Sequence, residues 1–232
     1  KDGNDLYPEI RRRAIAKLEE ELAKGDSKYW DLTRYEYIRR FGYYCTESSE
    51  HNAEYNNFFI KSKYPELIDR YNIPLDEYPR RCVNQIERWK KEYAELLETG
   101  VKDHERSREY ATHIMESIIT NTPYEIGGNV LNTGLIDNLP AEACVEVPCL
   151  VDARGVTPCY VGKLPVQCAA MNMTNINTQL LTIEAAHTRK KEDILRAVML
   201  EPRCAAQLSI DDMSRMIDDL NFHEIAWSRC PK

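Results

Sequence analysis

The densest group of chemically capable side chains lies between residues 41 and 51. There a glycine is followed by two phenols, Tyr43 and Tyr44, and then by the carboxyl of Glu47 and the imidazole of His51. Phenols and imidazoles can transfer protons, and carboxylates can accept hydrogen bonds from sugar hydroxyls. The same residue types also suit the start of a helix, where hydroxyls cap backbone amides and carboxylates meet the positive end of the dipole. The residues alone favour this structural interpretation over a catalytic one.

A second polar group occupies residues 127–140, where three asparagines, including Asn132, and three glycines separate apolar residues. Asparagine offers a donor and an acceptor, as sugar hydroxyls require, but asparagine and glycine are equally the residues that permit positive φ in turns. Both interpretations stay open. A third polar group at 172–179 indicates either a wet interface or site, or a polar helix face. Of the histidines, His187 is expected in the core and His104 and His113 on solvated helix faces.

The elements that position these groups are mainly helices in the first half of the chain. Apolar residues recur every three or four positions, and proline or glycine punctuates the ends. This spacing predicts a helix from about residue 6 to 22, one between Asp31 and Gly42, one ended by Gly100, and one through 110–118.

The second half changes pattern. Short strands are expected over 144–147 and 158–161, bounded by Pro140, Pro148, Gly155 and Gly162. Helical spacing returns after residue 165, and an S-x-x-D capping box at 209–212 predicts a last helix. The fold class is therefore α+β and helix-dominated, with two subregions of one core that meet near residue 123.

Composition excludes several classes of protein. The 232 residues carry a net charge of −7, 43% are hydrophobic and 30% are charged, and no apolar run is long enough to span a bilayer. The acidic balance disfavours nucleic acid as a partner. The eight cysteines form no CxxC pair, which predicts reduced, mostly buried thiols in a cytoplasmic protein. No GxGxxG or GxxxxGK motif is present, and the first residue is not Met, so the chain is expected to be a fragment.

Several segments carry a family resemblance. They read Asn-x-Gly-x-Ile-x-Asn-Leu-Pro at 132–140, Val-Glu-Val-Pro-Cys-Leu-Val-Asp at 145–152, Val-Gly-Lys-Leu-Pro at 161–165 followed by Gln167, and Gln-Leu-Leu-Thr-Ile-Glu-Ala-Ala at 179–186. In this order they resemble the C-terminal half of glycoside hydrolase family four. Residues 46–55 (Thr-Glu-Ser-Ser-Glu-His-Asn-Ala-Glu-Tyr) and 72–78 (Asn-Ile-Pro-Leu-Asp-Glu-Tyr) are similar to its melibiase-type alpha-galactosidases. The likeness covers essentially the whole chain.

The resemblance implies a fold and a chemistry. The fold would be the family's C-terminal domain over residues 1–232, similar to that of lactate and malate dehydrogenases, with helices packed on a small, mainly antiparallel sheet. The activity would be hydrolysis of alpha-galactosides such as melibiose. Family members use NAD and a divalent metal, usually manganese, to oxidise C3, eliminate the aglycone, add water and reduce again. Oxidation acidifies the C2 proton, so a tyrosine can remove it without the usual pair of carboxylates.

The resemblance also suggests roles for particular residues. Tyr43 best matches the catalytic base, with Tyr44 as runner-up, while Glu47, His51 and Asn132 are candidates for binding sugar hydroxyls. The NAD-binding domain and the metal ligands are expected upstream, so no cysteine here is assigned to metal. The fragment alone is expected to bind neither cofactor and to be inactive, and its expected partners are the sugar, the missing half and further copies of itself. The alternative is a noncatalytic helical assembly module.

Overall fold

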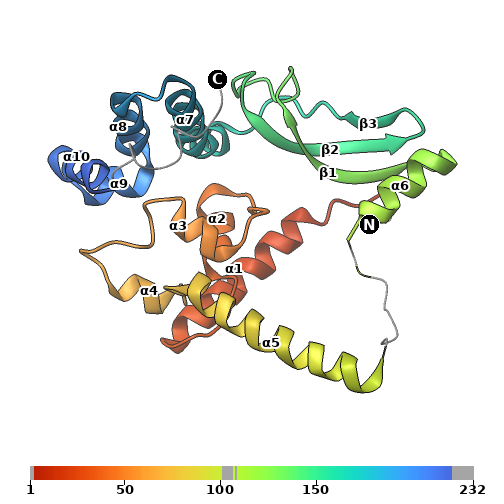
Figure 1. Cartoon of the computed structure of the whole chain (residues 1–232), viewed down its shortest axis with the longest axis horizontal. Coiled ribbons are helices and arrows are strands. Elements are labelled where there is room, and N and C mark those ends of the chain that lie inside the picture. Colours follow the sequence, from red (N-terminus) through yellow and green to blue (C-terminus); the bar gives the residue numbers. More distant parts are fainter. Residues whose placement is uncertain (1–2, 101–106, 108, 221–232) are drawn as a thin grey trace. The chain divides into compact units, whose positions relative to one another are not determined.

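The computed structural model describes residues 3–100, 107 and 109–220 (Figure 1). Helices dominate these residues, and three strands form one small sheet. The helices are α1 (Tyr7–Lys24), α2 (Leu32–Phe41), α3 (Ser49–Glu54), α4 (Glu66–Arg70), α5 (Glu77–Thr99), α6 (Ala111–Thr120), α7 (Val166–Thr188), α8 (Lys191–Leu200), α9 (Pro202–Gln207) and α10 (Ile210–Asp219). The strands are β1 (Tyr124–Leu131), β2 (Cys144–Asp152) and β3 (Gly155–Pro158). The predicted helix-dominated α+β class is confirmed.

The predicted helix ends follow from local chemistry. Gly42 ends α2 at φ 88°, a left-handed conformation that glycine adopts without a Cβ clash, and its amide donates to the carbonyl of Ile38. At the start of α10, the Ser209 hydroxyl accepts from the Asp212 amide and the Asp212 carboxylate accepts from the Ser209 amide. Both halves of the predicted capping box are therefore present.

The sheet has the order β1-β2-β3, and β2 pairs antiparallel with β3, with Cys149 opposite Pro158 and Asp152 opposite Gly155. The predicted strand ends were wrong. Proline at position 148 lies inside β2 rather than at its boundary, and β3 ends at 158 instead of beginning there. The next residues leave the ladder, and Gly162 forms a parallel bridge with Ile136 instead.

The chain divides into two compact units, and the boundary predicted near residue 123 was wrong. The larger unit comprises the described parts of Lys1–Ile73, Gly128–Val147 and Cys159–Lys232, and the smaller comprises those of Pro74–Gly127 and Pro148–Pro158. The change in composition along the chain does not reveal this division, because distant segments assemble into each unit.

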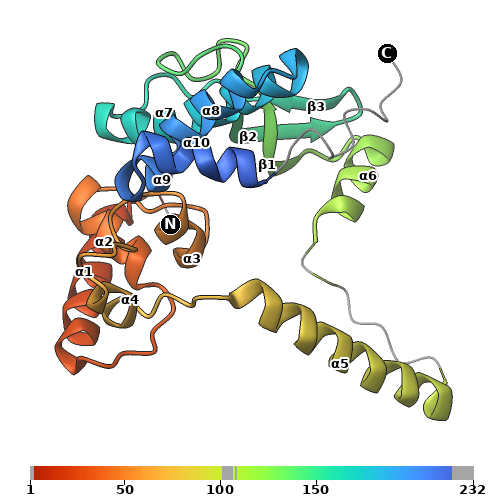
Figure 2. The same ribbon diagram turned by 60° about the vertical axis from the view of Figure 1, so that its left-hand side comes forward.

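An aromatic cluster anchors the larger unit where α2 and α3 meet. Tyr37, Ala53, Phe59 and Ile73 are buried together, and the rings of Tyr37 and Phe59 meet edge to face at 5.7 Å. Met171 of α7 packs against this cluster. In Figure 2, α7 and α8 run beside one another in the same unit. The residues that connect α2 to α3 therefore begin and end at helices that are packed into this cluster.

Two expectations about side-chain burial were also wrong. Of the seven described cysteines, all free thiols, only Cys149 is buried, while Cys144 and Cys159 are exposed. Cys230 and His104 lie outside the described residues. His187 is exposed in the last turn of α7 rather than in the core. Among the described residues, no helix is both long and apolar enough to cross a bilayer.

Candidate functional site

The residues between α2 and α3 are held by a phenol from the start of α1. The Tyr7 hydroxyl donates to the carbonyl oxygen of Gly42 at 3.2 Å and accepts from the amide of Tyr44 at 2.9 Å. The Tyr7 ring also stacks on the Tyr43 ring, with 6.2 Å between centroids. One side chain, 35 residues away in sequence from the loop's first residue, therefore defines the path of the backbone through Tyr43.

Tyr44 is held by a buried ion pair. Its hydroxyl donates to the Asp31 carboxylate at 2.6 Å, and Arg34, which also donates to Asp31, lies 4.6 Å from the Tyr44 ring centroid. Burial, with the hydrogen bond to Asp31, raises the pKa of Tyr44. A phenol with a raised pKa gives up its proton less readily, so this arrangement disfavours Tyr44 as the base.

Tyr43 is placed differently. Its side chain is 47% exposed, and no hydrogen bond from the described residues reaches its hydroxyl. The ring contact with Tyr7 orients the phenol without using its oxygen. Of the two adjacent tyrosines, Tyr43 therefore presents the oxygen that is available to a ligand.

Glu47 and His51 face one another one helical turn apart. The His51 Nδ1 lies 2.9 Å from a Glu47 carboxylate oxygen, and the same oxygen accepts from the Ser48 amide at 2.7 Å. These contacts, the backbone bond first, lower the pKa of Glu47. His51 also stacks on Tyr55 at 5.4 Å. Both polar side chains stay partly exposed, so the pair can meet a sugar hydroxyl while it also orders the start of α3.

The cap of α3 is part of the same arrangement. The Ser48 hydroxyl accepts from the His51 amide at 3.2 Å, and the Ser49 hydroxyl accepts from the amides of Thr33 and Arg34. Ser49 therefore joins α3 to the first turn of α2. The structural interpretation of this polar group is accordingly correct for the serines, whereas it leaves the exposed tips of Glu47 and His51 unexplained.

Asn132 has a structural role in this protein. The side chain is 1% exposed, and its amide nitrogen donates to the carbonyls of Ile136, Leu139 and Pro140 at 2.9 to 3.1 Å. Its oxygen accepts from the amides of Leu135 and Ile136. Every donor and acceptor of the side chain is in use, so Asn132 closes the loop at 132–140. A sugar hydroxyl could contact it only by displacing one of these bonds.

The two polar groups meet through the start of α7. The Asn138 amide donates to the Leu164 carbonyl at 2.9 Å and accepts from the Leu164 amide at 3.0 Å. Three residues later, the Gln167 side chain donates to the Phe41 carbonyl at 3.1 Å. The sequence arguments missed Tyr7, Asp31 and Gln167 as positioning residues. Only Gln167 carried a signal, because it lies in a segment that resembles the family.

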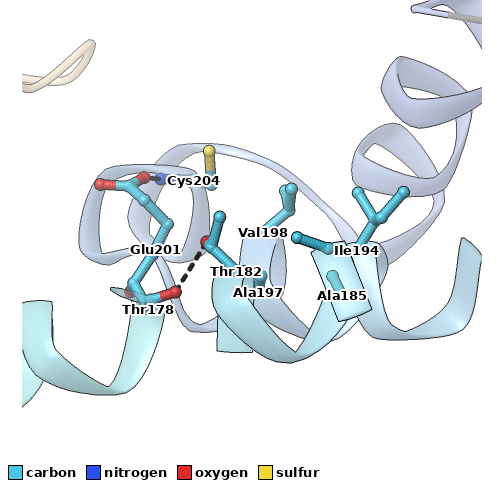
Figure 3. Close-up of a pocket in the computed structure, with 9 residues that line it drawn as sticks. Thr178, Thr182, Ala185, Ile194, Ala197, Val198, Glu201 and Cys204 are labelled. Atoms are coloured by element: carbon cyan, nitrogen blue, oxygen red, sulfur yellow. Dashed lines mark hydrogen bonds between the residues drawn. The ribbon is translucent and has the colours of Figure 1, made fainter. Parts of the chain in front are cut away.

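A cavity of about 290 Å³ lies among α7, α8 and α9 (Figure 3). Its walls are mostly methyl and methylene groups, including Ala185, Ile194 and Val198, and the Glu201 carboxylate is turned to the Cys204 amide at 2.6 Å. Sugars need several polar partners, which this lining does not supply. None of the predicted site residues lines the cavity.

The described residues do not supply a ligand set for the metal or the dinucleotide that the family resemblance implies. Within residues 3–100, 107 and 109–220, no three His, Cys, Asp or Glu side chains gather to hold a metal ion. The sequence also lacks a glycine-rich phosphate cradle of the GxGxxG type. The described residues alone therefore do not fit the metal or the dinucleotide, and no catalytic step is assigned to either group on them.

Fold and sequence together define a glycoside hydrolase domain. Residues 1–204 match the family model described as "Family 4 glycosyl hydrolase C-terminal domain". The chain therefore belongs to glycosyl hydrolase family 4 and carries its C-terminal domain. The segment resemblance noted in the sequence is confirmed.

Relatives and solved structures agree with this assignment. The chain is 56% identical over 220 residues to an alpha-galactosidase of Bacillus subtilis, covering 95% of this chain and 49% of that protein. It is similar to a solved structure described as a glucosidase of Bacillus subtilis, with a TM-score of 0.78 and 19% identity, covering 94% of this chain and 51% of the other. It is also similar to a 6-phospho-alpha-glucosidase from gut microorganisms, solved in complex with NAD and Mn²⁺, with a TM-score of 0.65, 19% identity, full coverage of this chain and 52% of the other. The chain thus spans about half the length of these proteins.

Proposed function

We propose that this chain is the substrate-binding and catalytic C-terminal part of an alpha-galactosidase that hydrolyses alpha-galactosides such as melibiose. The observation that carries the proposal is the Tyr43 phenol, which is exposed and has an unused oxygen on a loop fixed by Tyr7 and Gln167. The 56% identity to a protein named alpha-galactosidase supports the substrate class. Because the chain spans about half of that relative, the activity is proposed for the longer protein.

In this proposal Tyr43 accepts the proton from C2 of the galactose ring. Glu47 and His51 orient the sugar hydroxyls, since both tips are partly exposed and already share one hydrogen bond. Asn132 contributes indirectly, because its hydrogen bonds fix the shape of the loop at 132–140. NAD and a divalent metal, proposed to be manganese, would supply the oxidation that makes this proton acidic, and both would be held by the missing half.

The test uses the longer protein with its cofactors. The substitution Tyr43→Phe removes only the phenolic oxygen, and positioned acid–base groups contribute about 10²–10⁴-fold. We expect kcat on an alpha-galactoside to fall by that order, with exchange of the C2 proton into deuterated solvent falling in parallel. The Tyr44→Phe variant is the control for a structural phenol and should mainly lose stability.

Two results would overturn the proposal. Near-normal turnover and exchange in Tyr43→Phe, together with loss of both in Tyr44→Phe, would move the base to Tyr44. Retained activity in both variants would place the base elsewhere. If the longer protein cleaves no alpha-galactoside at all, the alternative of a noncatalytic helical assembly module is favoured.

A cytoplasmic location is a further part of the proposal.

The division of labour between the two halves has its own test. This chain alone is expected to bind NAD negligibly and to be inactive, because its sequence contains no glycine-rich phosphate cradle. Isothermal titration calorimetry measures this directly. Micromolar binding of NAD by this chain would contradict the assignment of the nucleotide site to the missing half.

A further inference from the structure

Two half-buried thiols from distant parts of the sequence lie beside the loop of residues 42–48, which connects α2 to α3 and carries Tyr43. Cys45 belongs to this loop, and Cys168 lies in the first turn of α7. Both residues belong to the larger compact unit. Both are free thiols, and neither has a part in the proposed chemistry.

Contacts on either side of Cys168 place it near Cys45. Its neighbour Gln167 donates to the carbonyl of Phe41, the residue directly before the loop, at 3.1 Å. One turn further along α7, Met171 packs against the aromatic cluster, and Cys45 packs against the same cluster. Residues three apart on a helix share one face, so Cys168 lies on the face of α7 that turns toward the cluster and Cys45.

The two thiols also interact electrostatically. Burial, and then the nearby Cys168 thiol, raise the pKa of Cys45 to about 11, whereas Arg34 acts in the opposite direction. Burial raises the pKa of Cys168 as well. A second negative charge at short range disfavours ionisation of the first, so each thiol makes the other harder to deprotonate. Both groups are therefore mostly protonated at neutral pH, and they stay reduced unless an oxidant is supplied.

We propose that Cys45 and Cys168 form a reversible disulfide when a peroxide is present, and that this bond clamps the loop of residues 42–48 to α7. The peroxide oxidises one thiolate to a sulfenic acid and leaves as hydroxide. The second thiolate attacks that sulfur, the S–S bond forms, and a second hydroxide leaves. In total the two thiols lose two electrons and two protons, and the peroxide becomes two waters.

The position of Cys45 favours this bond. It lies on a loop, whose backbone can adjust to the geometry that a disulfide requires more easily than the interior of a helix can. The second step takes place within one folded chain, so it outcompetes attack by thiols that are held further away. The inference goes beyond the proposed activity and does not rest on it.

The test oxidises the folded chain with hydrogen peroxide and, in parallel, with diamide, a diazene that takes two electrons and two protons from a pair of thiols. The remaining thiols are then alkylated, and peptide mapping without reductant identifies the linked peptides. The reference is the same treatment in urea, where folding no longer selects the pairs. We expect the Cys45–Cys168 link to be enriched at least about tenfold in the folded chain, because folding raises the effective concentration of one thiol near the other. Dithiothreitol should reverse it.

Two substitutions serve as a matched pair. Cys168→Ser removes one of the two sulfur atoms, whereas Cys204→Ser removes another half-buried thiol whose pKa is also raised by burial. Only Cys168→Ser should abolish the link to Cys45. Hydrogen exchange of the amides at 42–48 measures the clamp. We expect oxidation to slow it at least about tenfold in the parent and in Cys204→Ser, and to leave it unchanged in Cys168→Ser.

Far-ultraviolet circular dichroism checks that both variants fold like the parent, and Cys45→Ser replaces Cys168→Ser if the latter does not. The proposal is overturned if the folded chain yields no Cys45–Cys168 link, or yields it no more often than the chain in urea. It is also overturned if Cys45 pairs mainly with another cysteine. A link that forms without slowing exchange in the loop overturns the clamp.

Discussion

The side-chain amide of Gln167 donates to the backbone carbonyl of Phe41 across 126 residues of sequence, at 3.1 Å. Gln167 lies in the first turn of α7, and Phe41 is the last residue of α2, directly before the loop that carries Tyr43. Because Asn138 binds both backbone groups of Leu164, the segment before α7 is tied to the loop that Asn132 closes. The segment of residues 164–167 therefore contacts both polar loops, and it is called the tether below.

Replacing Gln167 by alanine tests this tether. One neutral hydrogen bond contributes about 1 kcal/mol, so the free energy of unfolding of the chain should fall by that amount or less. In the longer protein we expect Gln167→Ala to lower kcat, and to do so by more than its small loss of stability would explain. The reason is that the Phe41 carbonyl precedes Tyr43 by only two residues. The control is Gln179→Ala, an exposed glutamine further along α7. Equal turnover in the two variants would show that the tether does not position Tyr43.

Asn132→Ala should destabilise the fold strongly. It removes five hydrogen bonds and leaves buried backbone groups of residues 135, 136 and 139, and a half-buried one of residue 140, without this partner. Each unpaired buried group costs about 1–3 kcal/mol, and local adjustment recovers part of the loss, so we expect a decrease of about 3–5 kcal/mol. Urea denaturation measures it, with the exposed Asn129→Ala as the control. A variant that keeps full stability but loses sugar binding would make Asn132 a ligand residue instead.

Glu47 should make stability depend on pH in the acid range. Its pKa in the folded chain is lowered, first by the Ser48 amide and then by the His51 ring. A lowered folded pKa contributes stability above the unfolded value of about 4.3, and this contribution is lost as pH falls through the folded pKa. Urea unfolding at a series of acid pH values should show Glu47→Gln less stable than the parent near neutrality, with the gap closing on acidification. A gap that does not vary with pH would contradict this.

The thiols should react in an order set by exposure. Cys144 and Cys159 are exposed, while Cys149 is fully buried. Burial also raises the pKa of Cys45 and Cys204 to about 11, which lowers their thiolate fraction. Alkylation of the folded chain followed by peptide mass mapping should therefore label Cys144 and Cys159 first and Cys149 last. In the unfolded chain without reductant, all eight cysteines should be labelled, and a protected pair would reveal a disulfide.

The sequence by itself determined the local structure where short-range chemistry is decisive. The left-handed glycine at 42 and the capping box at 209–212 act within one helical turn, so both were predictable from neighbouring residues. Family segments spread along the chain also sufficed to predict the family. The ends of the strands were not predictable in this way. Pro148 lies inside β2 but just before the residues that pair with β3, which begin at Cys149, so its missing N–H removes no bond from that pairing.

The family resemblance already favoured Tyr43 over Tyr44, but only the tertiary structure shows a physical difference between the two side chains. Tyr43 and Tyr44 are chemically equal in the sequence, but Asp31 binds the hydroxyl of one and leaves the oxygen of the other unused. Asn132 likewise looked equally suited to a turn or to a sugar, until its five hydrogen bonds assigned it to the loop. Contacts with partners far along the chain decide these roles, because hydrogen-bonding capacity is a property of the residue whereas its use depends on which groups folding brings within reach.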